Sequence, residues 1–427
     1  MTQTFQTDKP KGSPIKWVPS VYFGMGLPFV TLSVVSVLMF KDLGISNEEI
    51  TYWTSLLILP WSLKPIFSLV MELIGTKRQY IIITEMITAL MFGLIAFALP
   101  LPSFFSIALA LMAVMAVSGS THDIAGDGIY MQELSERQQG EYVGWQGAFY
   151  NLAKILTNGF LVYLAGRLAQ TMGQTKAWMV IMGISGAIML LLAVYHLWVL
   201  PRETRKSQAK SFNDGMAELL EVVRSFFTKK YIWLYLAFIF LYRLAEGLAM
   251  KVAPLFLKDP IEQGGIGLSN EHYGVIYGTA GTIAFIVGSI LSGYYISHFG
   301  LRRVLSSLVL IFNVPFGVFF LLALYQPSSL AWITTGIVFE YFSYGFGFVG
   351  VTLFMMQQIA PGKYQMAHYA FANSLMNLSV MVPGMISGKL SMLLGYQGFF
   401  IAVLIAAIPV ILLSFFLPFA HNTDKSS

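Results

Sequence analysis

The chain has 427 residues, of which 56% are hydrophobic and 11% are charged. Soluble domains contain about 45–50% apolar and about 25% charged residues, and long apolar stretches recur throughout this sequence. These features indicate a polytopic α-helical membrane protein, since a membrane β-barrel would show weak alternation over about ten residues instead. The absence of cysteine excludes disulfides, thiolate metal sites and cysteine catalysis. The net charge of +5 does not indicate nucleic-acid binding, because the basic residues lie between the apolar stretches rather than in one patch.

Twelve stretches are long enough to cross a bilayer, which requires about 20 apolar residues each. They lie near residues 17–40, 50–73, 79–99, 103–131, 142–166, 177–200, 231–257, 271–297, 303–325, 329–357, 365–393 and 397–419. No cleavable signal is expected, because the first apolar stretch follows a polar tail and is long enough to span the bilayer by itself.

A polar segment at 201–230 divides the spans six and six. We therefore expect a six-helix bundle at 1–200 and another at 231–427. The later part of the segment, MAELLEVVRSFF, has helical apolar spacing and is predicted to lie along the membrane surface. A solvated linker anchored to anionic lipid and a partner-binding segment are both compatible with it. The internal duplication predicts a self-sufficient monomer.

The distribution of basic residues predicts that both termini are cytoplasmic. With the N-terminus inside, the cytoplasmic segments contain 17 Lys and Arg residues, the external loops contain four, and five lie within spans. Cytoplasmic loops of membrane proteins carry an excess of Lys and Arg.

A short motif recurs in the two halves of the chain. ELIGTKR follows the second span and SHFGLRR follows the eighth, with the glycine and the basic pair at one offset (300 − 75 = 225). Glycine permits a tight turn, and the cations can neutralise a nearby helix C-terminus. The two copies resemble the loop motif that joins spans two and three of each half in the major facilitator superfamily, although Ser297 replaces the acid in the second copy. The predicted gating-loop residues are Glu72, Gly75, Lys77, Arg78, Gly300, Arg302 and Arg303.

The stretch MAVSGSTHDIAGDGIYMQEL at 115–134 carries His122, Asp123 and Asp127 into the end of an apolar run. In a helix, Asp123 and Asp127 lie one turn apart on the same face. A carboxylate inside a bilayer is costly unless it is paired or meets water, so such groups are usually functional or partnered. We predict a functional role for these aspartates, with simple solvent exposure at the helix end as the alternative.

Further ionisable residues fall inside the predicted spans: Lys64, Lys154, Arg243, Glu246, Lys251 and Glu340. Transporters bind substrate near the bilayer midplane between their two halves. Cations there suit a substrate carboxylate or phosphate, and a carboxylate can carry a proton. The alternatives are mutual neutralisation of Arg243 and Glu246, and extension of Lys64 or Lys251 to the nearer membrane surface.

The aromatic residues, histidines and glycines of the spans can each have a functional role or a packing role. Trp145, Tyr150 and Tyr242 could stack on a sugar or fill the core, and His122 and His368 suit proton transfer or packing. Glycines in spans ten and eleven can bend helices or serve as packing notches. The sequence has no phosphate-binding glycine loop, metal cluster or nucleophile–base arrangement, so neither a metal nor a cofactor is expected. The one candidate for a lipid-modifying enzyme is His122 with Asp123 and Asp127.

Four segments resemble the AmpG-like permeases, a group within the major facilitator superfamily that also includes acetyl-CoA transporters and some siderophore permeases. The run STHDIAGD at 120–127 resembles their S-x-Q-D-I-x-x-D, and LYRLAE at 241–246 resembles their L-Y-K/R-L-x-D/E. Phe339-Glu340 with the later glycine pair resembles their span-ten motif. Lys64 stands eight residues before Glu72, as the family lysine does.

The resemblance implies a fold of twelve helices in two six-helix bundles. It also implies a proton-driven importer of the bacterial inner membrane that brings GlcNAc-anhydro-MurNAc and its peptides into the cytoplasm. By position, Asp123, Asp127, Glu246 and Glu340 would couple protons. With the residues discussed above, the predicted substrate-binding set is Lys64, His122, Trp145, Tyr150, Asn151, Lys154, Tyr242 and Arg243.

Two departures from the family keep other substrates open. His122 stands where the family has glutamine, and Asn151 stands where AmpG has an arginine, with Lys154 about one turn later. A siderophore, a free amino sugar or another organic anion is therefore an alternative substrate. A receptor that binds its ligand without moving it is the alternative of another class. Carboxylates at mid-depth in both halves favour transport.

Overall fold

The computed structural model describes residues 13–73, 75–202 and 212–420, and within these ranges the regular secondary structure is helical. Six crossings precede the linker: α1 (Val18–Val30), η2 (Thr31–Val35) and α2 (Ser36–Asp42); α3 (Asn47–Leu56), α4 (Leu59–Ser62) and α5 (Lys64–Leu73); α6 (Lys77–Ala98); α7 (Phe104–Glu133); α8 (Glu136–Lys154), η3 (Ile155–Leu161) and α9 (Val162–Met172); and α10 (Gln174–Val199). A short turn, η1 (Pro14–Lys16), precedes α1.

Six more crossings follow the linker helix α11 (Phe212–Phe227). They are α12 (Ile232–Lys258); α13 (Asn270–Tyr273), η5 (Gly274–Gly281) and α14 (Thr282–Phe299); α15 (Leu301–Asn313), η6 (Val314–Phe316) and α16 (Gly317–Tyr325); α17 (Leu330–Phe354) and η7 (Met355–Ile359); and the two arms of α18 (Gln365–Phe416). A turn, η4 (Ile261–Gln263), lies between α12 and α13. The arms of α18 meet at Gly395, whose φ of 64° breaks the helix. The twelve predicted spans are confirmed.

Nine helical runs in the described ranges are long and apolar enough to cross a membrane, with α18 counted once. The second and fifth crossings are absent from these nine for a physical reason. The second is divided into three short helices, and the fifth begins with the polar helix α8. Both crossings carry predicted site residues, so their irregularity coincides with the candidate site.

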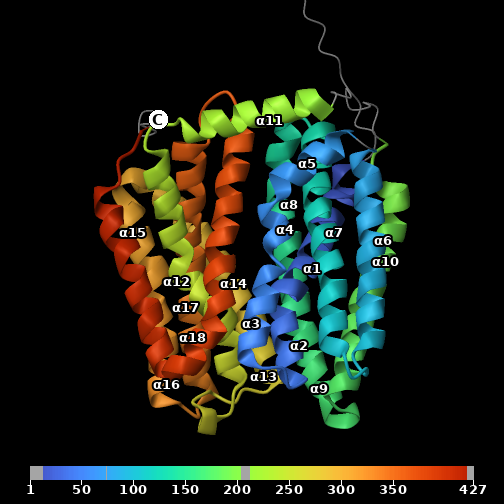
Figure 1. The fold of residues 1–427 in the computed structure, drawn as a ribbon, viewed down its shortest axis with the longest axis vertical. Helices are drawn as coiled ribbons and strands as arrows, with labels where there is room; N and C mark the ends of the chain where they lie inside the picture. Colours follow the sequence, from blue (N-terminus) through green and yellow to red (C-terminus); the bar gives the residue numbers. More distant parts are fainter. Residues whose placement is uncertain (1–12, 74, 203–211, 421–427) are drawn as a thin grey trace, which may run out of the picture.

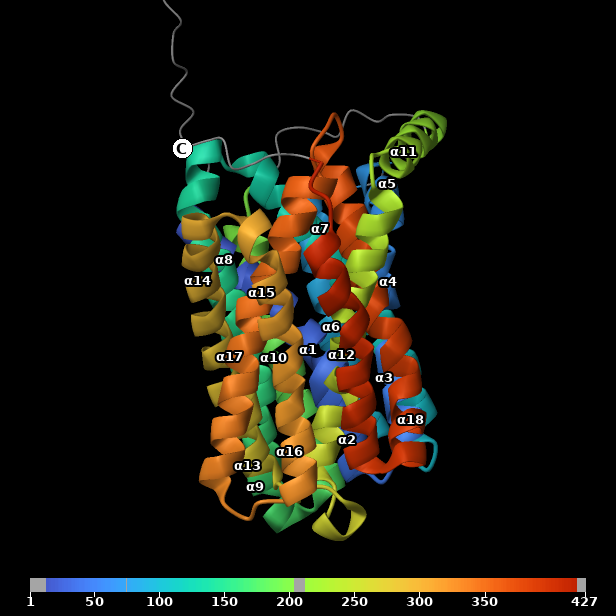
Figure 2. The ribbon, with the colours of Figure 1, turned by 90° about the vertical axis from the view of Figure 1, so that its left-hand side faces the viewer.

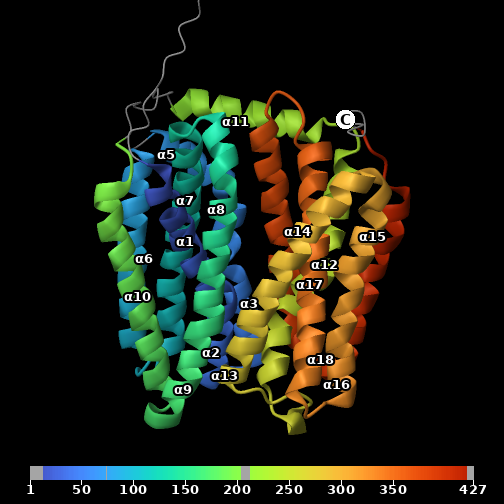
Figure 3. The ribbon, with the colours of Figure 1, turned by 180° about the vertical axis from the view of Figure 1, so that it is seen from behind.

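The helices before and after the linker form two groups that lie side by side, here called the N half (residues 13–202) and the C half (residues 212–420) (Figure 1). Helix α11 lies across one end of both groups, and the views in Figures 2 and 3 place it at the same end. We call this the linker end, and the opposite end, near α13 and α16, the far end. Residues 203–211 of the predicted linker lie outside the described residues.

One apolar cluster runs through both halves. It contains Phe40 and Trp178 from the N half and Phe256 and Phe400 from the C half, all fully buried. Two smaller clusters belong to a single half each, one around Trp17 and Ile81 and another drawn from the C half alone. Burial of aromatic side chains stabilises packing, so the shared cluster holds the two halves together.

Glycines allow the two halves to approach closely along two lines, where α3 meets α18 and where η3 meets η5. The backbone N–H of Gly388 donates to Thr51 Oγ1 at 3.1 Å. A Cβ at Gly388 would lie 2.2 Å from that oxygen, and a Cβ at Gly278 would lie 2.1 Å from the carbonyl oxygen of Asn158. Small residues permit such close helix contact in membranes, so these glycines act as packing notches.

We expect Gly388→Ala to destabilise the protein by about 1–3 kcal/mol, because the added methyl group has no space beside Thr51. Gly293→Ala is the matched control, since a Cβ at Gly293 in α14 meets no atom within 4 Å and alanine favours the helix. The thermal unfolding midpoints of both purified variants check this prediction. Equal midpoints would contradict the packing role of Gly388.

Candidate functional site

Asp123 is held in α7 by two donors from the second crossing. Trp61 Nε1 donates to Asp123 Oδ2 at 2.7 Å, and Lys64 Nζ reaches the same oxygen at 3.1 Å. The aspartate is 7% exposed, and Asp123 Oδ1 is buried without a partner among the described atoms. A Cβ at Gly119, one turn before Asp123, would meet the Trp61 ring at 3.0 Å. The small residues of this stretch therefore admit the ring that binds the aspartate.

Asp127, one turn further along α7, is exposed and accepts a hydrogen bond from the Tyr22 hydroxyl at 2.8 Å. Gln146 Nε2 in turn donates to the Tyr22 hydroxyl at 2.9 Å. The two aspartates thus differ in environment, because Asp123 meets a cation in a buried position and Asp127 meets a neutral donor at an accessible one.

The C half contains a second buried charge pair. Arg243 and Glu246, which lie on α12, make a two-point contact in which Arg243 Nε donates to Glu246 Oε2 at 2.6 Å and a terminal nitrogen binds Oε1. The Tyr344 hydroxyl of α17 donates to Glu246 Oε1 at 2.8 Å. The Arg243 guanidinium also lies 5.3 Å from the Phe348 ring centroid. Arg243 and Glu246 therefore neutralise one another, as one of the two interpretations predicted.

Glu340 is 5% exposed and has no hydrogen bond or ion pair to a described side chain. It lines a cavity of about 50 Å³ together with Glu246, Tyr277 and Tyr344 of the C half and Val34 of the N half. A buried ionised carboxylate without a partner is strongly unfavourable. Glu340 therefore suits a role in which it binds a proton or a donor group.

Lys154 extends from α8 toward the C half. Its Nζ lies 4.8 Å from the ring centroid of Phe285 in α14. It has no carboxylate within ion-pair distance among the described residues. This lysine is therefore a cation between the halves that is available to an anionic ligand.

The remaining predicted substrate-binding residues have varied surroundings. Trp145 is 43% exposed, and Tyr150 is half-buried on the same helix. Asn151 donates to the Gly147 carbonyl of its own helix at 2.8 Å. Tyr242 is fully buried, and its hydroxyl donates to the Gly347 carbonyl at 2.7 Å, so it packs inside the C half in this conformation. His122 pairs with Glu85 inside the N half, 3.2 Å away.

Both predicted loop motifs form tight turns. Gly75 and Gly300 have φ values of 77° and 80°, a left-handed conformation that favours glycine. The side chain of Lys77 crosses Gly128 of α7, where a Cβ would lie 2.5 Å from it. Arg78 donates to the Leu197 carbonyl in the last turn of α10, which is the predicted contact with a helix C-terminus.

The second loop copy makes fewer contacts, since the side chains of Arg302 and Arg303 are exposed. Glu72 belongs to α5, and its side chain lies outside the described residues.

Lys251 does not extend outward, and that alternative was wrong. Its side chain is 1% exposed, and Nζ donates to the Ser33 carbonyl at 2.5 Å and the Thr54 carbonyl at 3.3 Å. Ser33 lies in the π-helical segment η2, whose backbone bonds are irregular and leave carbonyls available to other donors. The lysine thus ties α12 of the C half to the first two crossings.

A polar network at the far end joins the two halves, and we call it the far-end network. Lys41 pairs with Asp259, and Lys258 pairs with Asp42 at 2.8 Å. Lys41 and Asp42 are neighbours at the end of the first crossing of the N half, and Lys258 and Asp259 are neighbours at the end of the first crossing of the C half. The lysine of each half therefore pairs with the aspartate of the other half. Charges in partly buried pairs interact more strongly than exposed ones.

Two asparagines complete the same exchange. Asn47 donates to Asp259 at 3.0 Å, and Asn270 donates to Asp42 at 2.5 Å. Trp178 donates to Asp42 at 3.0 Å, while Tyr396 occupies the corresponding place beside Asp259. The far-end network therefore has approximate two-fold symmetry, with lysine, aspartate, asparagine and an aromatic donor contributed by each half.

Sequence reasoning did not identify the two aspartates of the far-end network, Asp42 and Asp259. It also did not identify Glu85 and His196. The dipeptide Lys-Asp stands at the end of both the first and the seventh span, and this repeat would have indicated the far-end network. Glu85 lies eight residues inside α6 and is an ionisable residue within an apolar span, the same signal that identified Glu340. Among the described residues, no group of three or more His, Asp and Glu side chains has the geometry of a metal site.

Comparison with known proteins identifies the family. The family model of the Major Facilitator Superfamily matches residues 20–385. The chain belongs to this superfamily. The transporter is 24% identical to a Haemophilus influenzae protein, and the match covers 95% of each chain. It is also 23% identical to the anhydromuropeptide permease of Escherichia coli strain K12, over 79% of this chain and 65% of that permease.

Solved structures support the same fold. The transporter matches the bacterial homologue of the human lysosomal transporter Spinster, in an inward-facing and unoccupied conformation, with a TM-score of 0.71. The match covers 96% of this chain and 97% of that one at 14% sequence identity. The likeness to AmpG-like permeases is thus confirmed at modest identity, and the protein is a multi-pass membrane transporter of a family that is normally not enzymatic.

We expect Arg243→Met to destabilise the transporter by about 3–5 kcal/mol, because it leaves the buried Glu246 carboxylate without its cation. The double variant Arg243→Met with Glu246→Gln removes both charges, so it should be destabilised less than the single variant. Thermal unfolding midpoints compare the two. Arg137→Met provides a baseline, since Arg137 forms an exposed pair with Glu141 and such pairs contribute little. A double variant less stable than the single one would contradict this view.

Proposed function

We propose that the transporter is a proton symporter that imports peptidoglycan-derived GlcNAc-anhydro-MurNAc, or a related muropeptide or amino sugar, across the bacterial inner membrane by alternating access. The observation that carries the proposal is the pair of buried charge sites, one in each half, at positions of the AmpG-like motifs. Asp123 with Lys64 and Glu246 with Arg243 supply a carboxylate and a cation on each side of the interface.

The proposed division of roles follows from the environment of each group. Lys154 lies between the halves and has no carboxylate partner in the part of the chain that the structure describes, so it would bind the acidic group of the substrate. The exposed Trp145 ring would stack on a sugar face. Glu340, for which no described side chain is a partner, and Asp127 would bind and release the transported proton together with Asp123 and Glu246.

In this proposal the linker end is cytoplasmic, as the excess of basic residues predicts. The far-end network then closes the outer side, and the conformation is inward-facing. Transport requires the exchanged ion pairs to open, because the outward-facing state must separate the far ends of the two halves. The protein would work as a monomer, since each half supplies one member of every far-end ion pair.

The test is uptake of labelled GlcNAc-anhydro-MurNAc by cells that lack their own permease, with and without a protonophore. Accumulation that collapses with the protonophore supports both the substrate and proton coupling. Accumulation that survives it points to another driving ion. Failure of uptake in cells that make the protein would overturn the proposed substrate, and labelled siderophores and free amino sugars would be tested next.

We expect Asp123→Asn and Glu246→Gln each to abolish accumulation, because each removes a carboxylate that can bind a proton inside the membrane. Glu141→Gln is the control, since this glutamate is exposed and pairs with an exposed arginine. The measurement is steady-state uptake at equal amounts of protein in the membrane. Accumulation at the unmodified level in either buried variant would remove that residue from the mechanism.

Opening of the far-end network can be followed with a single thiol, because the natural chain has no cysteine. Val34→Cys places the thiol beside the inner cavity. We expect Lys41→Glu, which sets a carboxylate against Asp259, to raise labelling by an impermeant maleimide on intact cells about 5- to 30-fold, the change that corresponds to one or two kcal/mol.

Adding Asp259→Lys to Lys41→Glu should restore low labelling, because the ion pair is re-formed with its charges exchanged. Lys176→Glu is the control for charge alone, since Lys176 is an exposed far-end lysine. If Lys41→Glu and Lys176→Glu label equally, the far-end network does not hold the closed state.

A further inference from the structure

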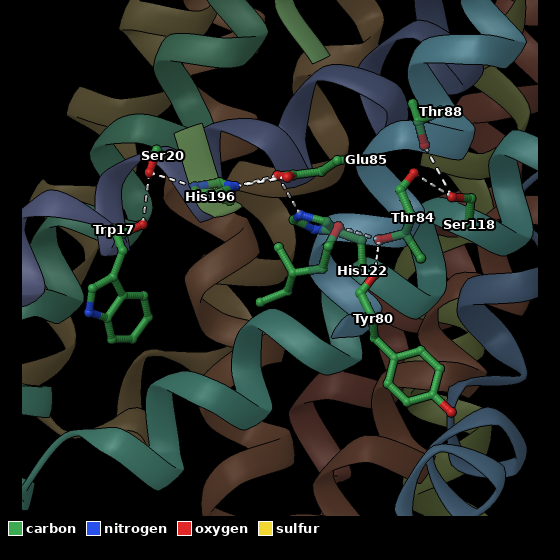
Figure 4. A network of polar contacts seen from close by, with 10 residues as sticks. Trp17, Ser20, Tyr80, Thr84, Glu85, Thr88, Ser118, His122 and His196 are labelled. Carbon is green, nitrogen blue, oxygen red and sulfur yellow. Dashed lines mark hydrogen bonds and ion pairs between the residues drawn. The ribbon is translucent and has the colours of Figure 1, made fainter. Parts of the chain in front are cut away.

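A buried carboxylate in the N half faces two histidines. Glu85 of α6 is 0% exposed, and both of its oxygens lie 2.8 Å from His196 Nδ1 of α10. His122 Nε2 of α7 lies 3.2 Å from Glu85 Oε1 (Figure 4). The three side chains come from three helices and meet inside the N half. The transport roles proposed above do not use Glu85 or His196.

The far side of the His196 ring contacts a hydroxyl that can reverse its role. His196 Nε2 lies 2.8 Å from Ser20 Oγ, and the same Oγ lies 3.0 Å from the Trp17 carbonyl oxygen (Figure 4). A hydroxyl has one proton to donate and can also accept. Ser20 can therefore donate to His196 Nε2, or donate to Trp17 and accept from His196 Nε2.

These contacts allow two complete hydrogen-bond patterns that differ by one proton. In the first, His196 is neutral, its Nδ1–H donates to ionised Glu85, and Ser20 donates to Nε2. In the second, a proton binds His196 Nε2, the Ser20 hydroxyl turns to the Trp17 carbonyl, and the Nδ1 proton is shared with Glu85. Neither pattern leaves a polar atom of Glu85, His196 or Ser20 without a partner, so uptake of the proton avoids the cost of an unsatisfied buried group.

His122, unlike His196, has a ring nitrogen for which no described atom is a hydrogen-bond partner. Its Nε2–H donates to Glu85, whereas His122 Nδ1 is buried without a partner among the described atoms. A proton on Nδ1 would be an unsatisfied buried donor, which costs about 1–3 kcal/mol. We therefore assign the exchangeable proton to His196 and Glu85 rather than to His122.

The neighbours of the cluster pack closely against it. Gly24 of α1 packs so closely that a Cβ there would lie 3.0 Å from Glu85 Oε1 and 3.7 Å from His122 Nε2. On α6 itself, the Thr88 hydroxyl is paired with Ser118 at 3.2 Å, so it does not compete for Glu85.

Two charged residues on the helices around the cluster reach it through an adjacent residue. Asp123 follows His122 on α7 and is paired with Lys64. Arg78 at the start of α6 binds the carbonyl of Leu197, next to His196 on α10. Because these groups have partners of their own, Glu85 depends on the two histidines.

We propose that Glu85, His122 and His196 form a proton-binding site that takes up and releases one proton at the linker end through His196 Nε2. Uptake changes the net charge of the three side chains from −1 to 0, and Ser20 turns as the proton arrives. The site lies within the N half and includes none of the carboxylates that are assigned above to proton coupling. Through His122 it adjoins Asp123, so its charge acts on the Asp123–Lys64 pair.

The experiment follows the imidazole nitrogens of ¹⁵N-histidine-labelled full-length protein in lipid nanodiscs by NMR between about pH 5 and about pH 8, the range in which histidine changes charge. Signals are assigned by single His→Gln variants. We expect His196 to carry protons on both nitrogens at low pH and on Nδ1 alone at high pH, with His122 neutral throughout. No substrate is added, so the result does not depend on the proposed function.

Glu85→Gln should remove the doubly protonated His196 over this range, while Thr88→Val, which alters a buried polar group one turn away on α6, should leave it unchanged. The exposed His298 serves as an internal reference. The wild-type titration alone is decisive even if Glu85→Gln fails to fold. A His196 that does not change its protonation, or that carries its single proton on Nε2 at high pH, would overturn the proposal.

Discussion

The free-energy cost of an ionised group in a low-dielectric interior is the constraint on which this structure depends. The buried charges described here are placed to reduce that cost in different ways. Asp123 has Lys64 and the Trp61 indole, Glu246 has Arg243 and the Tyr344 hydroxyl, and Lys251 has backbone carbonyls. Among the described residues, Lys154 and Glu340 have no such partners, so in this conformation they are free to bind a ligand or a proton.

The same constraint explains why the contacts between the halves are polar at the far end. Lys41 and Lys258 each meet the aspartate of the other half, so separation of the halves would expose four charges that could be hydrated by water at the membrane surface. Ion pairs in such a position can be exchanged for hydration at modest cost, whereas the glycine contacts below them close only in one geometry. The far-end ion pairs therefore hold the two halves together in a specific way and can still separate, which is what opening of this end requires.

Glu85 differs from the other carboxylates because its partners are titratable. A lysine or arginine fixes the charge of its partner, but a histidine can gain or lose a proton near neutral pH. The Ser20 hydroxyl lets His196 do so without an orphaned hydrogen-bonding group. In the N half a permanent cation therefore holds Asp123 whereas histidines hold Glu85, and His122 and Asp123 are adjacent in the chain.

The sequence by itself determined the membrane class, the twelve spans, the duplicated loop glycines and the candidate charges, because hydropathy, span length and charge depth are local properties. It also determined the likeness to AmpG-like permeases through short motifs. Apart from the local pair of Arg243 and Glu246 on α12, the partners of the buried charges were decided only by the tertiary structure. The exchange of Lys41 and Lys258 between halves, the inward direction of Lys251 and the meeting of Glu85 with His196 join residues more than 100 positions apart. Such contacts depend on how helices cross, which no local pattern specifies.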